Sequence, residues 1–210
     1  MTRVRQARLL ARPLVRTVPW LPLPAAAVVG IGVLSLDGPT VLELRFAAIA
    51  LCVAAAFVLD DRAAGLAAAS PTSLLVRRAF RVALVLPFIG ALWGLALWYA
   101  GDGFHAGLTL ELAAMLAVTL AAAAVAAPFT SDARGGIVAA PVLLILLATA
   151  VLALPDSWTL FAHGSADPHW AASQQRWGAI LAVALLTLAC ASRDPCRPPL
   201  LDGRVSGRRC

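Results

Sequence analysis

The sequence contains no lysine, and all 17 of its basic residues are arginine. Without lysine there is no Walker A lysine to bind nucleotide phosphates, and no lysine that can form a Schiff base or act as a general base. Charge is also scarce, at 13% of the residues. Soluble domains average about 25% charged residues. These absences argue against ATP hydrolysis by this chain alone and against a water-soluble domain.

Motifs for metal binding and catalysis are missing as well. Two of the four cysteines lie in apolar runs and two near the C-terminus, without metal-site spacing. His163 and His169 share one segment with Asp167, but zinc sites need three or four convergent ligands at defined spacings. The chain has no evident Ser/His/Asp, paired-carboxylate or phosphate-binding pattern. We therefore expect no enzymatic activity, no metal and no cofactor in this chain.

Apolar residues make up 61% of the chain and gather in six segments: 22–36, 41–59, 82–100, 107–127, 136–154 and 178–192. A helix needs roughly 20 residues to cross the hydrocarbon core of a bilayer. The first and last segments are short and would need flanking residues to span. The pattern predicts an all-α integral membrane protein, with six transmembrane helices in a single domain over residues 21–192.

The distribution of arginine predicts the orientation. Fifteen of the 17 arginines lie before the first segment, after the second, after the fourth or after the last. By the positive-inside rule those sides are cytoplasmic. We therefore expect a plasma-membrane protein with both termini on the cytoplasmic side. Residues 193–210 then form a basic, disordered cytoplasmic tail. Residues 155–177 form an external loop, and its aromatic residues suit an interfacial belt. The arginine-rich, lysine-free composition favours a bacterial source.

The first 20 residues carry arginines three or four positions apart: Arg5, Arg8, Arg12 and Arg16. Apolar residues occupy the opposite face of the corresponding helix. This spacing predicts an amphipathic helix in the membrane interface, with its arginines at anionic headgroups. The alternative is a disordered basic leader that only fixes the orientation of the chain.

The connection between the second and third apolar segments, residues 60–81, is unusually long. Packed helices are commonly joined by about 2–8 residues. Asp60 and Asp61 suit a helix N-terminus, an alanine-rich stretch follows, and Ser70-Pro71 ends it. Three arginines then lead back to the membrane surface: Arg77, Arg78 and Arg81. We interpret this connection as a cytoplasmic docking element rather than a plain surface loop.

A resemblance supports this interpretation. The stretch "LDDRAAGLAAASPTSLLVRR" resembles the "DDPA…LAASPTP…RR" pattern of small actinobacterial permease-like membrane proteins, although Arg62 stands where that pattern has proline. The order of leader, six spans and long second connection resembles the six-helix, type two permeases of ATP-binding-cassette exporters.

That resemblance implies a function and partners. The leader would be an elbow helix, and the connection would hold a coupling helix that docks on a separate ATPase, which would bind ATP and Mg²⁺. The permease would work as a homodimer or with a second permease. The docking residues carried over are Asp60, Asp61, Arg62, Leu66, Ser70 and Thr72. Arg77, Arg78 and Arg81 would then lie at anionic lipid. No nucleic acid partner is expected, because the arginines flank apolar spans.

Two other functions fit parts of the pattern. A non-transporting membrane scaffold or accessory protein would bind a cytoplasmic partner through the same connection. A membrane enzyme acting on lipid is disfavoured, because no catalytic constellation is evident.

Three charged residues lie within the apolar segments. Glu43 and Arg45 are near the outer end of the second segment, and Glu111 is near the outer end of the fourth. Ionisable groups at membrane depth are costly and usually have a partner. Either Arg45 and Glu111 pair in an intramembrane polar cluster beside Glu43, or all three reach to the surface. No carboxylate lies at the centre of a segment, which argues against proton-coupled transport.

Overall fold

The computed structural model describes residues 20–35, 40–60, 74–101, 105–130, 134–155, 158–162 and 166–192. These residues are predominantly helical and include no strand, which confirms the expected all-α class. The helices are α2 (Pro22–Leu34), α3 (Val41–Ala56), η1 (Phe57–Leu59), α5 (Leu74–Ala100), α6 (His105–Ala126), η2 (Ala127–Phe129), α7 (Gly136–Leu152) and α8 (Trp170–Ala191). The leader up to residue 19, residues 61–73 and the tail from residue 193 lie outside the described residues.

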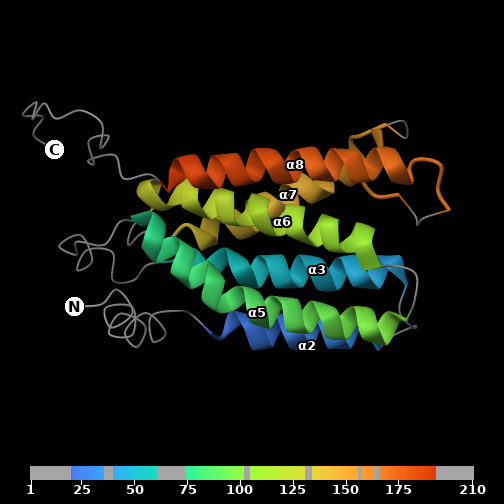
Figure 1. The fold of residues 1–210 in the computed structure, drawn as a ribbon, viewed down its shortest axis with the longest axis horizontal. Helices are drawn as coiled ribbons and strands as arrows, with labels where there is room; N and C mark the ends of the chain where they lie inside the picture. Colours follow the sequence, from blue (N-terminus) through green and yellow to red (C-terminus); the bar gives the residue numbers. More distant parts are fainter. Residues whose placement is uncertain are drawn as a thin grey trace, which may run out of the picture.

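The α-helices run antiparallel, each reversing the direction of the one before (Figure 1). Helices α2, α3 and α5 form one half of the bundle, and α6, α7 and α8 form the other. We name the two ends of the bundle the Arg45 end and the Arg78 end, after an arginine that lies at each. Helices α3, α6 and α8 begin at the Arg45 end and finish at the Arg78 end. Because α2 begins at the Arg78 end, the first and last described residues lie at the same end.

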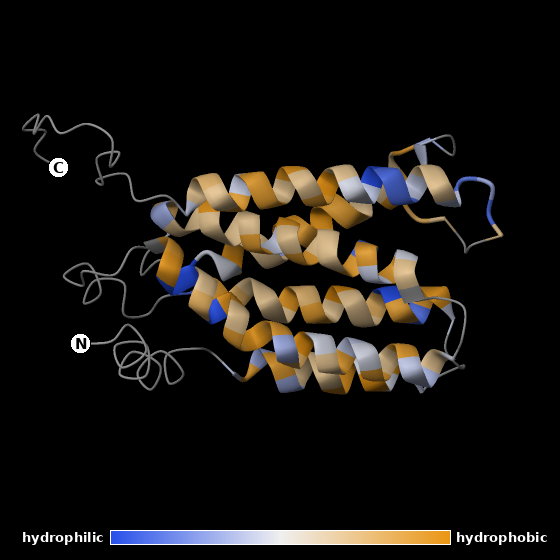
Figure 2. Ribbon diagram, viewed as in Figure 1, coloured by the Kyte–Doolittle hydropathy of each residue, from blue (hydrophilic) through white to orange (hydrophobic). Residues whose placement is uncertain are grey.

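Among the described residues, four helices are long and apolar enough to cross a membrane: Val41–Leu59, Leu75–Ala100, Ala106–Phe129 and Trp170–Ala191. Helices α2, with 13 residues, and α7, with 17, are apolar but shorter. Large apolar side chains are exposed along the bundle; Ile145 is 64% and Leu186 67% exposed. Figure 2 shows strongly hydrophilic residues mainly near the two ends. This surface is typical of a protein in contact with lipid.

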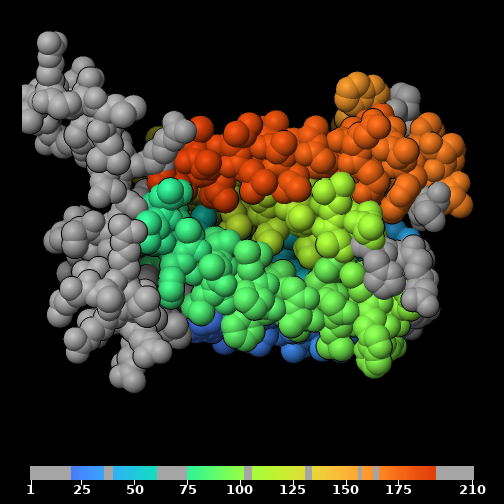
Figure 3. Space-filling view, in the orientation of Figure 1, coloured from blue at the N-terminus to red at the C-terminus, as the bar shows by residue number. Residues whose placement is uncertain are grey.

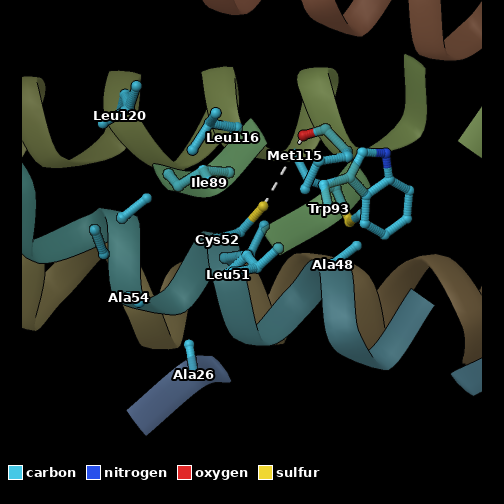
Figure 4. Close-up of a cluster of buried hydrophobic side chains, with 14 of the residues drawn as sticks. Ala26, Ala48, Leu51, Cys52, Ala54, Ile89, Trp93, Met115, Leu116 and Leu120 are labelled. Carbon is cyan, nitrogen blue, oxygen red and sulfur yellow. Dashed lines mark hydrogen bonds between the residues drawn. The ribbon is translucent and has the colours of Figure 1, made fainter. Parts of the chain in front are cut away.

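Helices α3 and α6 lie next to each other in the bundle (Figure 1), where the thiol of Cys52 is 3.9 Å from the carbonyl oxygen of Leu112. Many of their buried residues are small, with Ala56, Ala114 and Ala123 all at 0% exposure. Small side chains let helix backbones approach, which is how membrane helices commonly pack. Larger side chains such as Leu51, Trp93 and Met115 fill the space around them (Figure 4). The interior of the described bundle is therefore packed and apolar midway between its ends.

Helix α7 begins with two glycines that allow a close approach. A Cβ on Gly135 would overlap the carbonyl oxygen of Ala123 at the end of α6. A Cβ on Gly136 would lie 2.7 Å from the carbonyl oxygen of Ala56 and 2.9 Å from Cα of Phe57. The start of α7 is therefore wedged between the ends of α3 and α6, where only glycine fits.

We expect Gly136→Ala to destabilise the fold by about 1–3 kcal/mol, the usual cost of overpacking a tight contact. Gly178→Ala is the matched control, because nothing lies within 4 Å of a Cβ at Gly178. Thermal unfolding of both full-length variants in detergent measures the difference. Equal melting temperatures for the two variants would contradict the wedge.

Candidate functional site

Arg45 and Glu111 form a buried ion pair between α3 and α6. Nε of Arg45 lies 2.8 Å from Oε2 of Glu111, and the second guanidinium nitrogen donates to Oε1 at 2.9 Å. Arg45 is 8% exposed and Glu111 only 1%. Bidentate pairing of this kind is strong and fixes the guanidinium plane. Of the two arrangements left open by the sequence, the pair is therefore the one present, and these two residues do not reach the surface.

Glu43 is not part of this cluster. Its carboxylate accepts a hydrogen bond from the backbone N–H of Thr40 at 2.7 Å, and it also contacts the hydroxyl of Thr40. Thr40 directly precedes α3, so Glu43 stabilises the start of that helix, where a negative charge also favours the helix dipole. The expected three-residue cluster is thus a pair plus a helix cap.

Residues 158–162, which we call the strap, cross the Arg45 end of the bundle. The strap is irregular backbone between α7 and α8, in the orange part of the surface in Figure 3. Four side-chain donors hold three of its carbonyl oxygens. They are Arg45 to Ala162 at 2.8 Å, Arg176 to Thr159 at 2.7 Å, Ser173 to Leu160 at 2.6 Å and Trp177 to Leu160 at 2.9 Å.

Aromatic contacts add to these hydrogen bonds. The Arg45 guanidinium lies over the ring of Phe161, 5.1 Å from its centroid, and the rings of Phe161 and Trp177 meet edge to face at 5.5 Å. Trp177 is 3% exposed, whereas Trp158 is 60% exposed. The aromatic residues of 155–177 therefore do not all form an interfacial belt, because Phe161 and Trp177 pack against the core of the bundle.

Sequence reasoning missed the contribution of α8 to this site. Ser173, Arg176 and Trp177 stand three or four positions apart, so they share one helical face, and Gln174 reaches Glu111 at 3.5 Å. That polar spacing at the start of an apolar segment was a readable signal. The carbonyl groups that these side chains bind carry no signal in the sequence.

At the opposite end, Arg78 and Arg81 turn into the protein. Arg78 is 9% exposed and donates to the carbonyl oxygens of Ala191 at 2.8 Å and Ala124 at 3.3 Å. Arg81 is 4% exposed and donates to the carbonyl oxygen of Asp60 at 2.9 Å. Carbonyls at helix C-termini lack helical partners and carry partial negative charge. This corrects the expectation that Arg78 and Arg81 lie at lipid headgroups.

Asp60 is also buried, at 8% exposure. Its Oδ1 accepts a hydrogen bond from the backbone N–H of Gly136 at 2.7 Å. An aspartate oxygen at that position satisfies one of the free N–H groups at the start of α7, as a helix N-cap does. The carboxylate of Asp60 thus joins α3 to α7, which differs from its expected role in docking a partner.

The other predicted site residues are placed as follows. Arg77 is partly buried on α5 beside Arg78. Outside the described residues lie Asp61, Arg62, Leu66, Ser70, Thr72, Arg5, Arg8 and Arg12.

No protein-family model, curated protein or solved structure matches this chain. Functional conclusions therefore depend on the contacts at the two ends of the bundle.

We expect Glu111→Leu alone to cost about 3–5 kcal/mol, because it leaves the Arg45 guanidinium buried without its counter-charge. The double variant Arg45→Met/Glu111→Leu should recover most of that loss, since both buried charges are gone. Unfolding of the single and double variants in detergent gives the coupling energy. If the destabilisation of the double variant equals the sum of the destabilisations of the two single variants, the two side chains are not energetically coupled, which would contradict the prediction.

We expect Asp60→Ala to cost about 0.5–2 kcal/mol through loss of the cap on α7, and Asp60→Asn to cost less, because its carbonyl oxygen can still accept from Gly136. Hydrogen exchange of the Gly136 amide should accelerate in Asp60→Ala. Unchanged exchange at Gly136 would show that Asp60 does not cap α7.

Proposed function

We propose that this chain is the membrane-spanning permease subunit of an ATP-binding-cassette transporter, an exporter, coupled to a separate ATPase that binds ATP and Mg²⁺. The observation that supports this is the anchoring of the connection between α3 and α5. Asp60 lies directly before residues 61–73, and Arg78 and Arg81 follow shortly after them. These three side chains bind the ends of α6, α7 and α8 and the carbonyl group that follows η1. A force on the connection would therefore reach these helix ends.

In this proposal the Arg78 end is cytoplasmic and the membrane is the bacterial plasma membrane. Helices α2 and α7 complete six spans with the help of flanking residues. Arg77, Arg78, Arg81 and Arg134 belong to segments at the Arg78 end, which agrees with the positive-inside rule. Both termini are then cytoplasmic, because α2 begins and α8 ends on that side.

The packed interior bears on how such a permease would work. Leu51, Cys52, Ile89 and Met115 fill the middle of the bundle (Figure 4). Because these core side chains are apolar, the proposed path for a polar solute runs between this chain and a second permease. The same packing favours the alternative function, a non-transporting membrane scaffold that binds a cytoplasmic partner.

Purification of the tagged chain from its native membrane in mild detergent separates the two functions. A permease should bring down a stoichiometric partner with a Walker A motif, and the eluate should hydrolyse ATP. A partner without nucleotide chemistry, or recovery of the chain alone, would favour the scaffold.

The role of the connection is tested by replacing residues 63–69 with a Gly/Ser stretch of equal length. We expect ATPase stimulation to be lost while the melting temperature is kept, because Asp60, Arg78 and Arg81, which bind the helix ends, are left unchanged. Gly178→Ala on α8, where nothing lies within 4 Å of an added Cβ, is the control that should retain stimulation. Full stimulation by the Gly/Ser variant would rule out docking through this connection.

A further inference from the structure

We infer that the Arg45–Glu111 ion pair is a latch that keeps the strap, residues 158–162, closed over the Arg45 end of the bundle. The buried polar group at this end consists of Arg45, Glu111 and Gln174, which are joined by hydrogen bonds. The inference concerns the chain itself and does not depend on an ATPase partner.

The strap is held by two different elements. Its Thr159 and Leu160 carbonyls are bound by side chains of α8, namely Arg176, Ser173 and Trp177. Its Ala162 carbonyl is bound by Arg45 of α3. Helix α8 belongs to one half of the bundle and α3 to the other (Figure 1). The Arg45 contact is therefore where the strap bridges the two halves.

The geometry of Arg45 makes that contact depend on Glu111. One guanidinium nitrogen donates both to Oε1 of Glu111 and to the carbonyl oxygen of Ala162, at 2.9 and 2.8 Å. The second bond to Glu111, through Nε, fixes the plane of the group. The same plane lies over the ring of Phe161. Removing the pair therefore removes both a hydrogen bond and a ring contact from the strap.

The contacts on α8 remain when the latch opens. The strap would then stay attached to α8 through Thr159 and Leu160 while Ala162 moves away from α3. Ala162 is at 0% exposure in the closed arrangement, so its exposure to water reports the opening. Opening would admit water to the Arg45–Glu111 pair, whose members are 8% and 1% exposed in the closed arrangement.

The test measures the reactivity of a single cysteine at position 162. Ala162→Cys is introduced into the full chain after its four native cysteines are replaced, and the protein is placed in lipid nanodiscs, where both faces are accessible. A membrane-impermeant maleimide should label it slowly in the parent. The comparison is with Arg45→Met/Glu111→Leu, which leaves no unpaired buried charge from this pair. Labelling of this variant should be faster by about tenfold or more, as expected for the loss of one charge-assisted hydrogen bond.

Three controls make the result decisive. Trp158→Cys, at an exposed position, should react equally fast with and without the latch, and Ala114→Cys, in the core, should stay unreactive in both. Thr187→Val, on the exposed side of α8, should leave Ala162→Cys slow. Equal rates at Ala162→Cys in the parent and the double variant would overturn the latch. New reactivity at Ala114→Cys would overturn it too, since the pair would then hold the bundle together rather than the strap.

Discussion

A charged group cannot be left without a partner in hydrocarbon, and this constraint organises the bundle. Arg45 and Glu111 pair at one end. At the other end Arg78, Arg81 and Asp60 bind the backbone groups that helix ends leave free. Between these two levels the core is apolar. Helix α3 with η1 connects the levels, because it carries Arg45 near its start and is followed by Asp60. This central segment thus takes part in the polar contacts at both ends.

The sequence predicted the parts of the fold that are encoded locally. Long apolar runs identified the six α-helices of the described residues, because hydropathy and length are read directly from the sequence. Their bounds were less accurate. The third span was expected to begin at residue 82, yet α5 begins at Leu74 and has 27 residues. At about 1.5 Å per residue such a helix is longer than the hydrocarbon core is thick, so its first turns can carry Arg77, Arg78 and Arg81.

Side-chain roles were predictable only where both partners are side chains. Arg45 and Glu111 could be matched because opposite charges stood at the same depth in two apolar segments. The inward turn of Arg78 and the cap formed by Asp60 could not, because their partners are backbone groups at the ends of α6, α7 and α8. Tertiary packing determines which helix ends come close to a given side chain. Because nearly every residue has the same backbone carbonyl and N–H groups, the sequence does not indicate which of them will be the partner. The contacts of the strap escaped prediction for the same reason.

The two ends differ in what their arginines hold, and this determines where the molecule can change shape. Arg78 binds carbonyls at helix ends, and the helices that carry those groups must stay in place to keep the bundle packed. Arg45 binds the carbonyl of an irregular segment that is not part of any helix. When that segment leaves, water can take over its hydrogen bonds, so the exchange costs little beyond the lost contacts. The opening that we infer would therefore take place at the Arg45 end without unpacking helices, whereas Arg78 is bound to two helices that pack the bundle.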